Sequence, residues 1–286
     1  MESVIFQYLI EQKNITDKLT TYQERPAIFN REAPAAVDEN WKPGQQYPRI
    51  IFGLNMQEDP ERKTSGTLIM DVYISNDVFL EDIVPVVVDS VSGCFFSKEK
   101  DTIAVLWRQS EPFSTAEDGS EINGSTITFD VVAFPSQHLS FPCPVTAVDT
   151  YLKDLFPDYC ILGNDSPSGT FRATDERPVL YTRLQQYSPA SNPGNYHCTW
   201  YNPVMVIHVI APSVTVREII LKTIIEHMQQ DTRIKMPDKA PMRLLRLSFT
   251  AGADQLKAGQ LSVEGTYGIL RKYPDAELIK NATINE

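Results

Sequence analysis

The sequence is poor in cysteine and histidine, with four of each among 286 residues. Cys94, Cys143, Cys160 and Cys198 are widely spaced, form no C-x-x-C pair and have no histidines at zinc-finger spacing. We therefore expect reduced, mostly buried thiols, no metal site and no bound cofactor.

Long apolar runs are also absent. No stretch approaches the ~20 apolar residues that cross a bilayer. The first residues, MESVIFQYLIEQKN, lack the basic start, long apolar segment and small-residue cleavage site of a secretory signal. These absences predict a soluble protein made in the cytoplasm, with no membrane partner.

Basic residues are too few to bind nucleic acid tightly. The chain has 26 Lys and Arg against 37 Asp and Glu, for a formal net charge of -11. Such a surface repels phosphate backbones and offers no basic stripe. DNA passing through an acidic channel without being held is compatible with this charge.

Common catalytic motifs are missing. The sequence has no G-x-S-x-G elbow, Walker loop, H-E-x-x-H pair or Rossmann glycine run. His197 beside Cys198 is the sharpest hydrolase-like pattern, but adjacent side chains in a loop rarely form a nucleophile and base pair. We expect no catalytic residues and no enzyme activity.

The first half reads as helix, hairpin, helix, hairpin. Apolar residues at helical spacing predict a short helix over residues 4–15, and residues 47–56 and 67–76 alternate as an antiparallel hairpin that Pro48 opens. A second helix, kinked by Pro85 or late in starting, should follow Asn76 or Asp77 and end at Gly93. Strands over residues 102–113 and 125–135, separated by an acidic turn, complete this half.

The second half repeats that order. A helix over residues 148–156, strands over 176–187 and 201–212, a helix over 213–233 with a Thr215 and Glu218 capping box, and strands over 242–252 and 259–270 are predicted. The offset between matched landmarks is nearly constant, because Pro178 minus Pro48 is 130 and Gln260 minus Ser125 is 135. The fold class is therefore α+β, with two tandem copies of an antiparallel sheet carrying two helices on one face. The predicted divisions are a first domain at 1–135, a Pro-rich linker at 136–146, a divergent second copy at 147–274 and a tail at 275–286.

Aromatic and charged residues at the ends of elements are candidate contact residues. Large aromatic side chains are costly to expose in a monomer and are typical interface anchors. Turns that join long strands project from sheets and can meet a partner. The candidate interface residues are Trp41, Glu58, Asp59, Arg62, Lys63, Trp107, Phe113, Tyr196, Trp200 and Tyr201.

The first half resembles the tail terminator, or tail completion, proteins of long-tailed bacteriophages. The resemblance is carried by a short helix, the loop with REAP, then YPRIIF, a charged turn, LIMDVYISN, a helix, IAVLWRQSEPF and INGSTITFDVVAFP. The second half departs from it, because TDERPVLYT replaces QQYPRIIFG and no strand matches the one around Trp107.

The resemblance implies a structural virion protein with no catalysed reaction. Members of that family form a hexameric ring that caps the tail tube, ends its polymerisation and docks the head connector. The implied partners are the chain itself, in a ring of three or six copies, the tail tube protein, and sheath and head-connector or stopper proteins. DNA would only pass through the lumen, and the protein would be found in the virion tail or neck after assembly in the bacterial host cytoplasm.

Three other hypotheses stay open from the sequence. One is another neck or baseplate protein of a phage or phage-like injection particle. A second is a cytoplasmic hydrolase with a site between the two domains, where clefts often hold ligands. A third is a sensor of a small ligand, which would melt at a higher temperature with that ligand bound.

Overall fold

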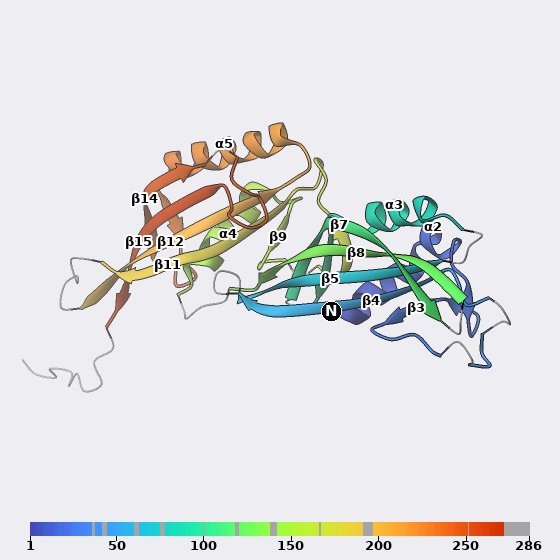
Figure 1. The fold of residues 1–286 in the computed structure, drawn as a ribbon. Coiled ribbons are helices and arrows are strands. Elements are labelled where there is room, and N and C mark those ends of the chain that lie inside the picture. The colour runs from blue at the N-terminus through green and yellow to red at the C-terminus, as the bar shows by residue number, and fades with distance from the viewer. Residues whose placement is uncertain are drawn as a thin grey trace, which may run out of the picture.

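The computed structural model describes residues 1–35, 38–41, 45–59, 63–74, 78–99, 101–117, 120–137, 142–165, 167–190, 197–250 and 252–271. Its fold is mixed α+β, as the sequence predicts, and it is mostly sheet. Two large curled sheets lie one after the other along the molecule (Figure 1). The tail predicted at 275–286 lies outside the described residues.

The N-terminal sheet has seven strands in the order β10-β6-β7-β8-β5-β4-β3. The predicted hairpins are present, since β4 pairs antiparallel with β5 and β7 pairs antiparallel with β8. The acidic stretch expected as a turn instead continues both β7 and β8. The strands are β3 (Ile28–Asn30), β4 (Arg49–Asp59), β5 (Lys63–Ile74), β6 (Cys94–Lys98), β7 (Asp101–Glu117), β8 (Ser120–Pro135) and β10 (Gly169–Arg172).

The C-terminal sheet has six strands in the order β13-β14-β15-β12-β11-β9. The four predicted strands of this half are its centre. A separate two-stranded ribbon in the N-terminal half joins β1 (Thr21–Tyr22) to β2 (Arg25–Pro26). The strands of the C-terminal sheet are β9 (Cys160–Leu162), β11 (Val179–Pro189), β12 (Cys198–Ile210), β13 (Arg233–Lys235), β14 (Pro241–Phe249) and β15 (Leu261–Leu270).

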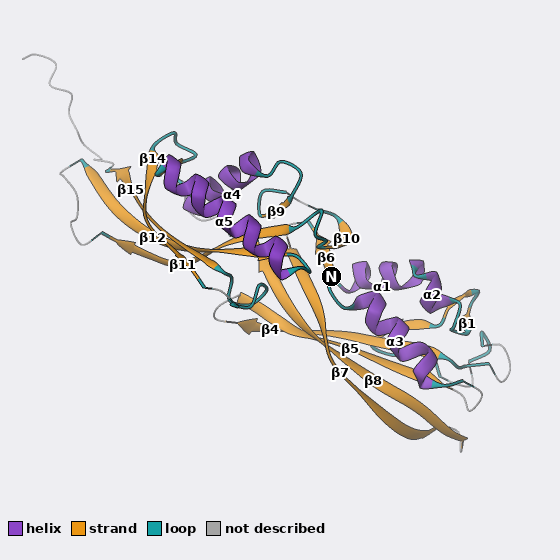
Figure 2. Cartoon of the chain, turned by 90° about the horizontal axis from the view of Figure 1, so that it is seen from above, coloured by secondary structure: helices purple, strands orange, loops and turns teal. Residues whose placement is uncertain are grey.

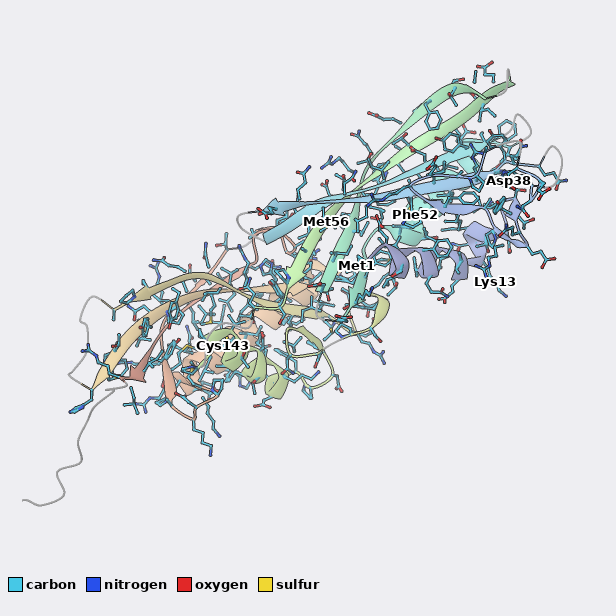
Figure 3. The ribbon with its side chains drawn as sticks, turned by 90° about the horizontal axis from the view of Figure 1, so that it is seen from below. Met1, Lys13, Asp38, Phe52, Met56 and Cys143 are labelled. Carbon is cyan, nitrogen blue, oxygen red and sulfur yellow. The ribbon has the colours of Figure 1, made fainter. Side chains whose placement is uncertain are left out.

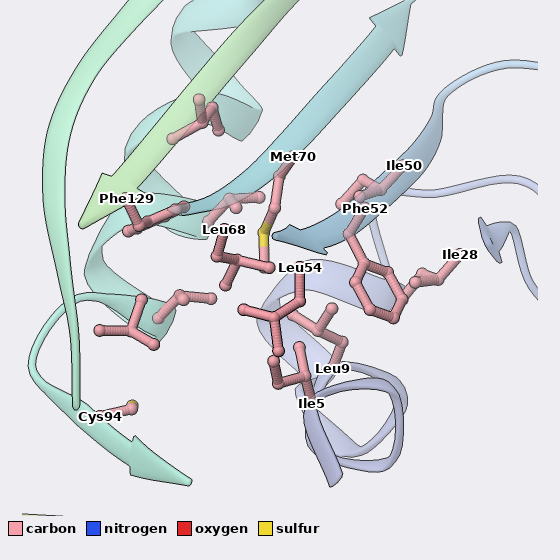
Figure 4. Close-up of a cluster of buried hydrophobic side chains, with 14 of the residues drawn as sticks. Ile5, Leu9, Ile28, Ile50, Phe52, Leu54, Leu68, Met70, Cys94 and Phe129 are labelled. Atoms are coloured by element: carbon pink, nitrogen blue, oxygen red, sulfur yellow. The ribbon is translucent and has the colours of Figure 1, made fainter. Parts of the chain in front are cut away.

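The helices of each half lie on one face of its sheet (Figure 2). In the N-terminal half α1 and α3 press apolar side chains onto β4, β5 and β8, where Ile5, Leu54 and Met70 meet in the core (Figure 4). In the C-terminal half α4 and α5 cover β11, β12 and β15 in the same way. The helices are α1 (Glu2–Glu11), α2 (Lys13–Thr16), α3 (Leu80–Val91), α4 (Pro144–Leu155) and α5 (Val214–Asp231).

Several details differ from the sequence predictions. The sheets are not purely antiparallel, because the short outer strands β3 and β9 pair parallel with β4 and β11. Ser213 rather than Thr215 caps α5, since its hydroxyl accepts a hydrogen bond from the Val216 amide. Helix α3 starts late, at Leu80, and the predicted caps Asn76 and Asp77 lie outside the described residues. Helix α4 begins at Pro144, inside the stretch predicted as linker, because proline suits the first helical position.

The two sheets share one strand order. Reading β3, β4, β5, β6, β7 and β8 against β9, β11, β12, β13, β14 and β15 reproduces every neighbour among these strands. Strand β14 thus occupies the place of β7, so the expectation that the second half lacks a counterpart of the strand around Trp107 was wrong. A helix also stands between β5 and β6, as α5 does between β12 and β13. The one addition is β10, which follows β9 in the chain but pairs with β6 of the N-terminal sheet.

Candidate interaction surfaces

The two sheets meet through the faces that carry no helix. Phe95 and Phe134 of the N-terminal sheet pack with Val179 and Tyr181 of the C-terminal sheet, and all four side chains are at most 2% exposed. The Phe134 and Tyr181 rings meet edge to face with centroids 5.1 Å apart. The Tyr181 hydroxyl also donates a hydrogen bond to the Pro135 carbonyl. The contact between the halves is therefore a packed apolar core at this point.

Strand β10 fastens the second half to the first. Phe171 stacks on Phe95 with centroids 5.0 Å apart and an interplanar angle of 11°. The Arg172 guanidinium donates to the carbonyls of Asp89 and Ser90 at the end of α3. It also donates to the Cys94 sulfur at 3.1 Å. One short strand thus combines sheet pairing, ring stacking and charged hydrogen bonds across the junction.

Two histidines, His197 and His208, occupy different surroundings. His208 is fully buried at the junction, with Nδ1 2.9 Å from the Gln255 carbonyl oxygen. His197 is exposed just before the other end of β12. The structure does not bring these two imidazoles together.

Trp41 does not offer the exposed ring expected of an interface anchor. Its side chain is 5% exposed and packs against Tyr22 and Phe29 at 4.8 and 5.7 Å between centroids. The indole N–H donates to the Ala35 carbonyl at 3.1 Å. Trp41 therefore closes the loop before β4 onto the sheet, and the expectation of an exposed Trp41 was wrong.

The predicted charged turn is only partly described. Glu58 is exposed and Asp59 is partly buried at the end of β4. Lys63 begins β5, and Arg62 lies outside the described residues.

The aromatic candidates of β7 remain on the surface to different degrees. Trp107 is 49% exposed, and its indole N–H donates to the Ser110 hydroxyl at 3.0 Å. Phe113 is partly buried against Tyr73, with centroids 5.2 Å apart. Phe113 also covers Gly124, where a Cβ atom would lie 2.3 Å from the ring. Trp107 is the better placed of the two to meet a partner.

Aromatic residues also gather near the end of the C-terminal sheet. Tyr201 stacks on Tyr187 with centroids 5.0 Å apart, and the Tyr187 hydroxyl lies 2.9 Å from that of buried Tyr267. Trp200 is 39% exposed. Tyr196 lies outside the described residues. The role of these candidates at an interface stays a prediction.

A groove of about 780 Å³ runs between α1 and the open edge of β4. Phe6, Leu54 and Met56 supply its apolar lining, and Figure 3 shows Met56 on β4 near Met1 at the start of α1. Its rim carries an ion pair of 2.9 Å between Arg31 and Glu2. The Arg31 guanidinium lowers the pKa of the Glu2 carboxyl. Sequence patterns alone did not indicate this groove, because it depends on how α1 packs beside β4.

Each large sheet has one partly uncovered outer edge, at β4 in the N-terminal sheet and at β14 in the C-terminal sheet. Strand β3 covers β4 only from Ile50 to Phe52, so in the described chain the rest of β4 pairs on its β5 side. Strand β13 covers only the first residues of β14, and beyond it Leu245 and Phe249 are 47% and 43% exposed. Uncovered strand edges are ready to pair with another chain.

Charge is distributed unequally between the halves. Residues 1–135 contain 22 acidic and 11 basic residues, whereas residues 136–286 contain 15 of each. The net charge of -11 therefore belongs to the first half. In the second half an exposed basic group follows β13 and β14, made up of Arg233, Lys235, Arg243 and Arg246.

One carboxyl group is buried in the described part of the C-terminal half. Asp149 of α4 is 4% exposed, and its Oδ2 lies 2.9 Å from where a Cβ atom on Gly163 would be. Burial raises the pKa of Asp149 to about 8; the Thr182 hydroxyl lowers it, and the charge of Asp165 raises it further. Asp165 itself forms an ion pair of 2.8 Å with Lys153. Asp149 is consequently held as the neutral acid at pH 7.

No protein-family model matches the chain, and no curated protein matches its sequence. Among the described residues, no helix combines the length and apolar character needed to cross a membrane. Within the same ranges, no three His, Cys, Asp or Glu side chains gather closely enough to hold a metal ion.

Proposed function

We propose that the protein is a structural virion component that assembles into a ring of three or six copies, caps a phage tail tube and presents a docking surface to the head connector. The observation that carries this proposal is the repeated strand order, which we infer to be an internal duplication of a tail-terminator-like domain. A chain with two similar units and unlike ends can join head to tail, and such contacts close into a ring when the rotations sum to a full turn.

The charge distribution supports the same proposal. A lumen that lets DNA pass should not bind phosphate, and the acidic first half meets that condition. The ring would end tube growth because one side matches the stacking surface of the tube and the other side does not. The protein would then be located at the tail or neck of the virion, with tube, sheath and connector or stopper proteins as its neighbours.

The test is the native mass of the purified protein over a range of concentrations, with electron microscopy of the same samples. We expect closed rings of three or six chains that bind the ends of tubes formed by the tail tube protein of the same virus. Tube length should stop increasing when rings are added. A protein that stays monomeric at every concentration and leaves tube growth unchanged would contradict the proposal.

A further inference from the structure

The two halves can be aligned position by position through their strand registers. Ile28 pairs with Ile50 on the helix-covered face of the N-terminal sheet, as Ile161 pairs with Leu180 in the C-terminal sheet. Successive side chains of a strand point to opposite faces. The next residue along each strand therefore gives a matching pair on the open face, which is Phe29 with Ile51 in one half and Leu162 with Tyr181 in the other.

In the C-terminal half this open face is buried by the first half. Leu162 and Tyr181 are 2% and 1% exposed because β6, β7 and β8 of the N-terminal sheet pack on them. In the N-terminal half the matching side chains are Phe29 and Ile51. The rings of Tyr22 and Trp41 pack against Phe29 and cover it in part, and Phe29 and Ile51 both remain partly exposed. The same position is thus covered in one half and incompletely covered in the other.

The covering surface has its own counterpart at the other end of the chain. Phe95 of β6 pairs with Ala104 of β7, and this pair packs in the junction. The aligned pair in the C-terminal half is Arg233 of β13 with Arg243 of β14, and both arginines are exposed. The free end of the second half therefore presents guanidinium groups where the first half presents apolar side chains.

The partly exposed face around Ile51 suits arginine. It already holds one: Arg49 is 5% exposed and lies over the Tyr73 ring, 5.1 Å from its centroid, since aromatic rings attract guanidinium groups. The group left for an incoming arginine is therefore the carboxylate of Asp71. The carboxylate of Asp71 is cross-strand to Ile51 and accepts a hydrogen bond of 2.6 Å from Thr126. Carboxylates and arginines form strong charge-assisted hydrogen bonds.

We propose that the contact between the two halves is repeated between chains, so that the β13 and β14 edge of one copy, with Arg233 and Arg243, docks on the β3 to β5 face of the next copy around Phe29, Ile51 and Asp71. This inference rests on the proposed ring and names its interface. It alternates the acidic half with the neutral half around the ring, which avoids placing two acidic halves in contact.

The experiment uses two full-length variants, each altered on one of the two surfaces. The docking edge is the β13 and β14 edge that carries Arg233 and Arg243, and Arg233→Glu with Arg243→Glu reverses its charge. The receiving face is the β3 to β5 face around Phe29, Ile51 and Asp71, and Ile51→Lys places a cation on it. The control is Arg177→Glu with Lys222→Glu, which makes the same charge change at exposed positions outside the contact. Thermal unfolding of each variant verifies that it is folded. If the double charge reversal does not fold, Arg243→Ala tests the same edge with a milder change.

Native mass then separates the outcomes. Each surface variant alone should be a monomer of 32.3 kDa, the control should form wild-type rings, and an equal mixture of the two surface variants should form 1:1 pairs. A pair forms because one member keeps an intact docking edge and the other keeps an intact receiving face. Arg243→Ala should raise the concentration at which rings form by about tenfold or more, as loss of a charged contact predicts.

Two results would overturn the inference. The first leaves the proposed ring in place, and the second contradicts the ring as well. Wild-type rings in both surface variants, or no pairs in the mixture, would mean that this interface is wrong while the ring itself stands. A wild-type protein that is monomeric at every concentration would remove both the interface and the proposed ring.

Discussion

Replacing Asp149 by asparagine should stabilise the protein, and the gain should grow with pH. The carboxyl group has an ordinary pKa of 3.8 in the unfolded chain and a pKa of about 8 when buried in α4. Between these values the folded protein keeps a proton that the unfolded chain releases. The unfolded state therefore binds fewer protons, and the free energy of unfolding falls as pH rises.

The size of the effect follows from the pKa difference. Each unit of pKa is worth about 1.4 kcal/mol, so Asp149 costs about 6 kcal/mol above pH 8 and almost nothing below pH 4. An asparagine has the same shape and no charge to lose. The difference in unfolding free energy between Asp149→Asn and wild type should rise by about 1.4 kcal/mol per pH unit between pH 4 and pH 8, and then level off.

Urea unfolding at pH 4.5, 6, 7.5 and 9 measures this difference. Asp154→Asn is the matched control, because Asp154 is an exposed carboxylate on the same helix. Its difference from wild type should stay within about 0.5 kcal/mol, as for most surface substitutions. A pH-independent difference for Asp149→Asn, parallel to the control, would refute the assignment of a neutral buried acid.

Three further substitutions test the packing. Phe134→Ala should lower the free energy of unfolding by about 3 to 5 kcal/mol in urea titrations, because the ring fills the junction between the sheets; a loss below 1 kcal/mol would mean that the junction is not packed. Arg172→Ala should cost about 1 to 3 kcal/mol through its lost hydrogen bonds to α3, whereas exposed Arg177→Ala should cost little. Gly66→Ala should lower the melting temperature, because its Cβ atom would lie 2.0 Å from a backbone oxygen of β4, while Gly53→Ala has nothing within 4 Å; equal melting temperatures would contradict that strand spacing.

The long elements of the fold could be predicted from the sequence because their patterns are strong. The alternation of Leu68, Met70 and Val72 marks one buried face of β5, and all three are fully buried. Strand β8 carries the same signal. These patterns can be recognised within a short stretch of sequence, because they depend only on the alternation of apolar and polar residues along one strand.

The short strands could not be predicted, because three residues carry no measurable periodicity. Strands β3, β9 and β13 exist only through pairing with longer neighbours. The same limit applies to β10, since nothing local to residues 169–172 indicates that their partner is β6, more than seventy residues earlier.

Side-chain exposure was also beyond local reasoning. Trp41 lies in a polar loop and was expected to be an exposed anchor. The rings of Tyr22 and Phe29, from earlier segments of the chain, pack against it and bury it. The buried Asp149 gave no signal either, because it follows an ordinary amphipathic helix pattern and its burial comes from packing against other segments.

The origin of β10 in the second half has a consequence for synthesis on the ribosome. Residues 1–135 emerge before the strand that borders β6, and Arg172 is made 37 residues later than Pro135. At ordinary rates of translation this delay is about 2 to 7 seconds. During that time the nascent chain would expose the β6 edge and the Phe95 ring, so the sheet is completed only when the beginning of the second half arrives.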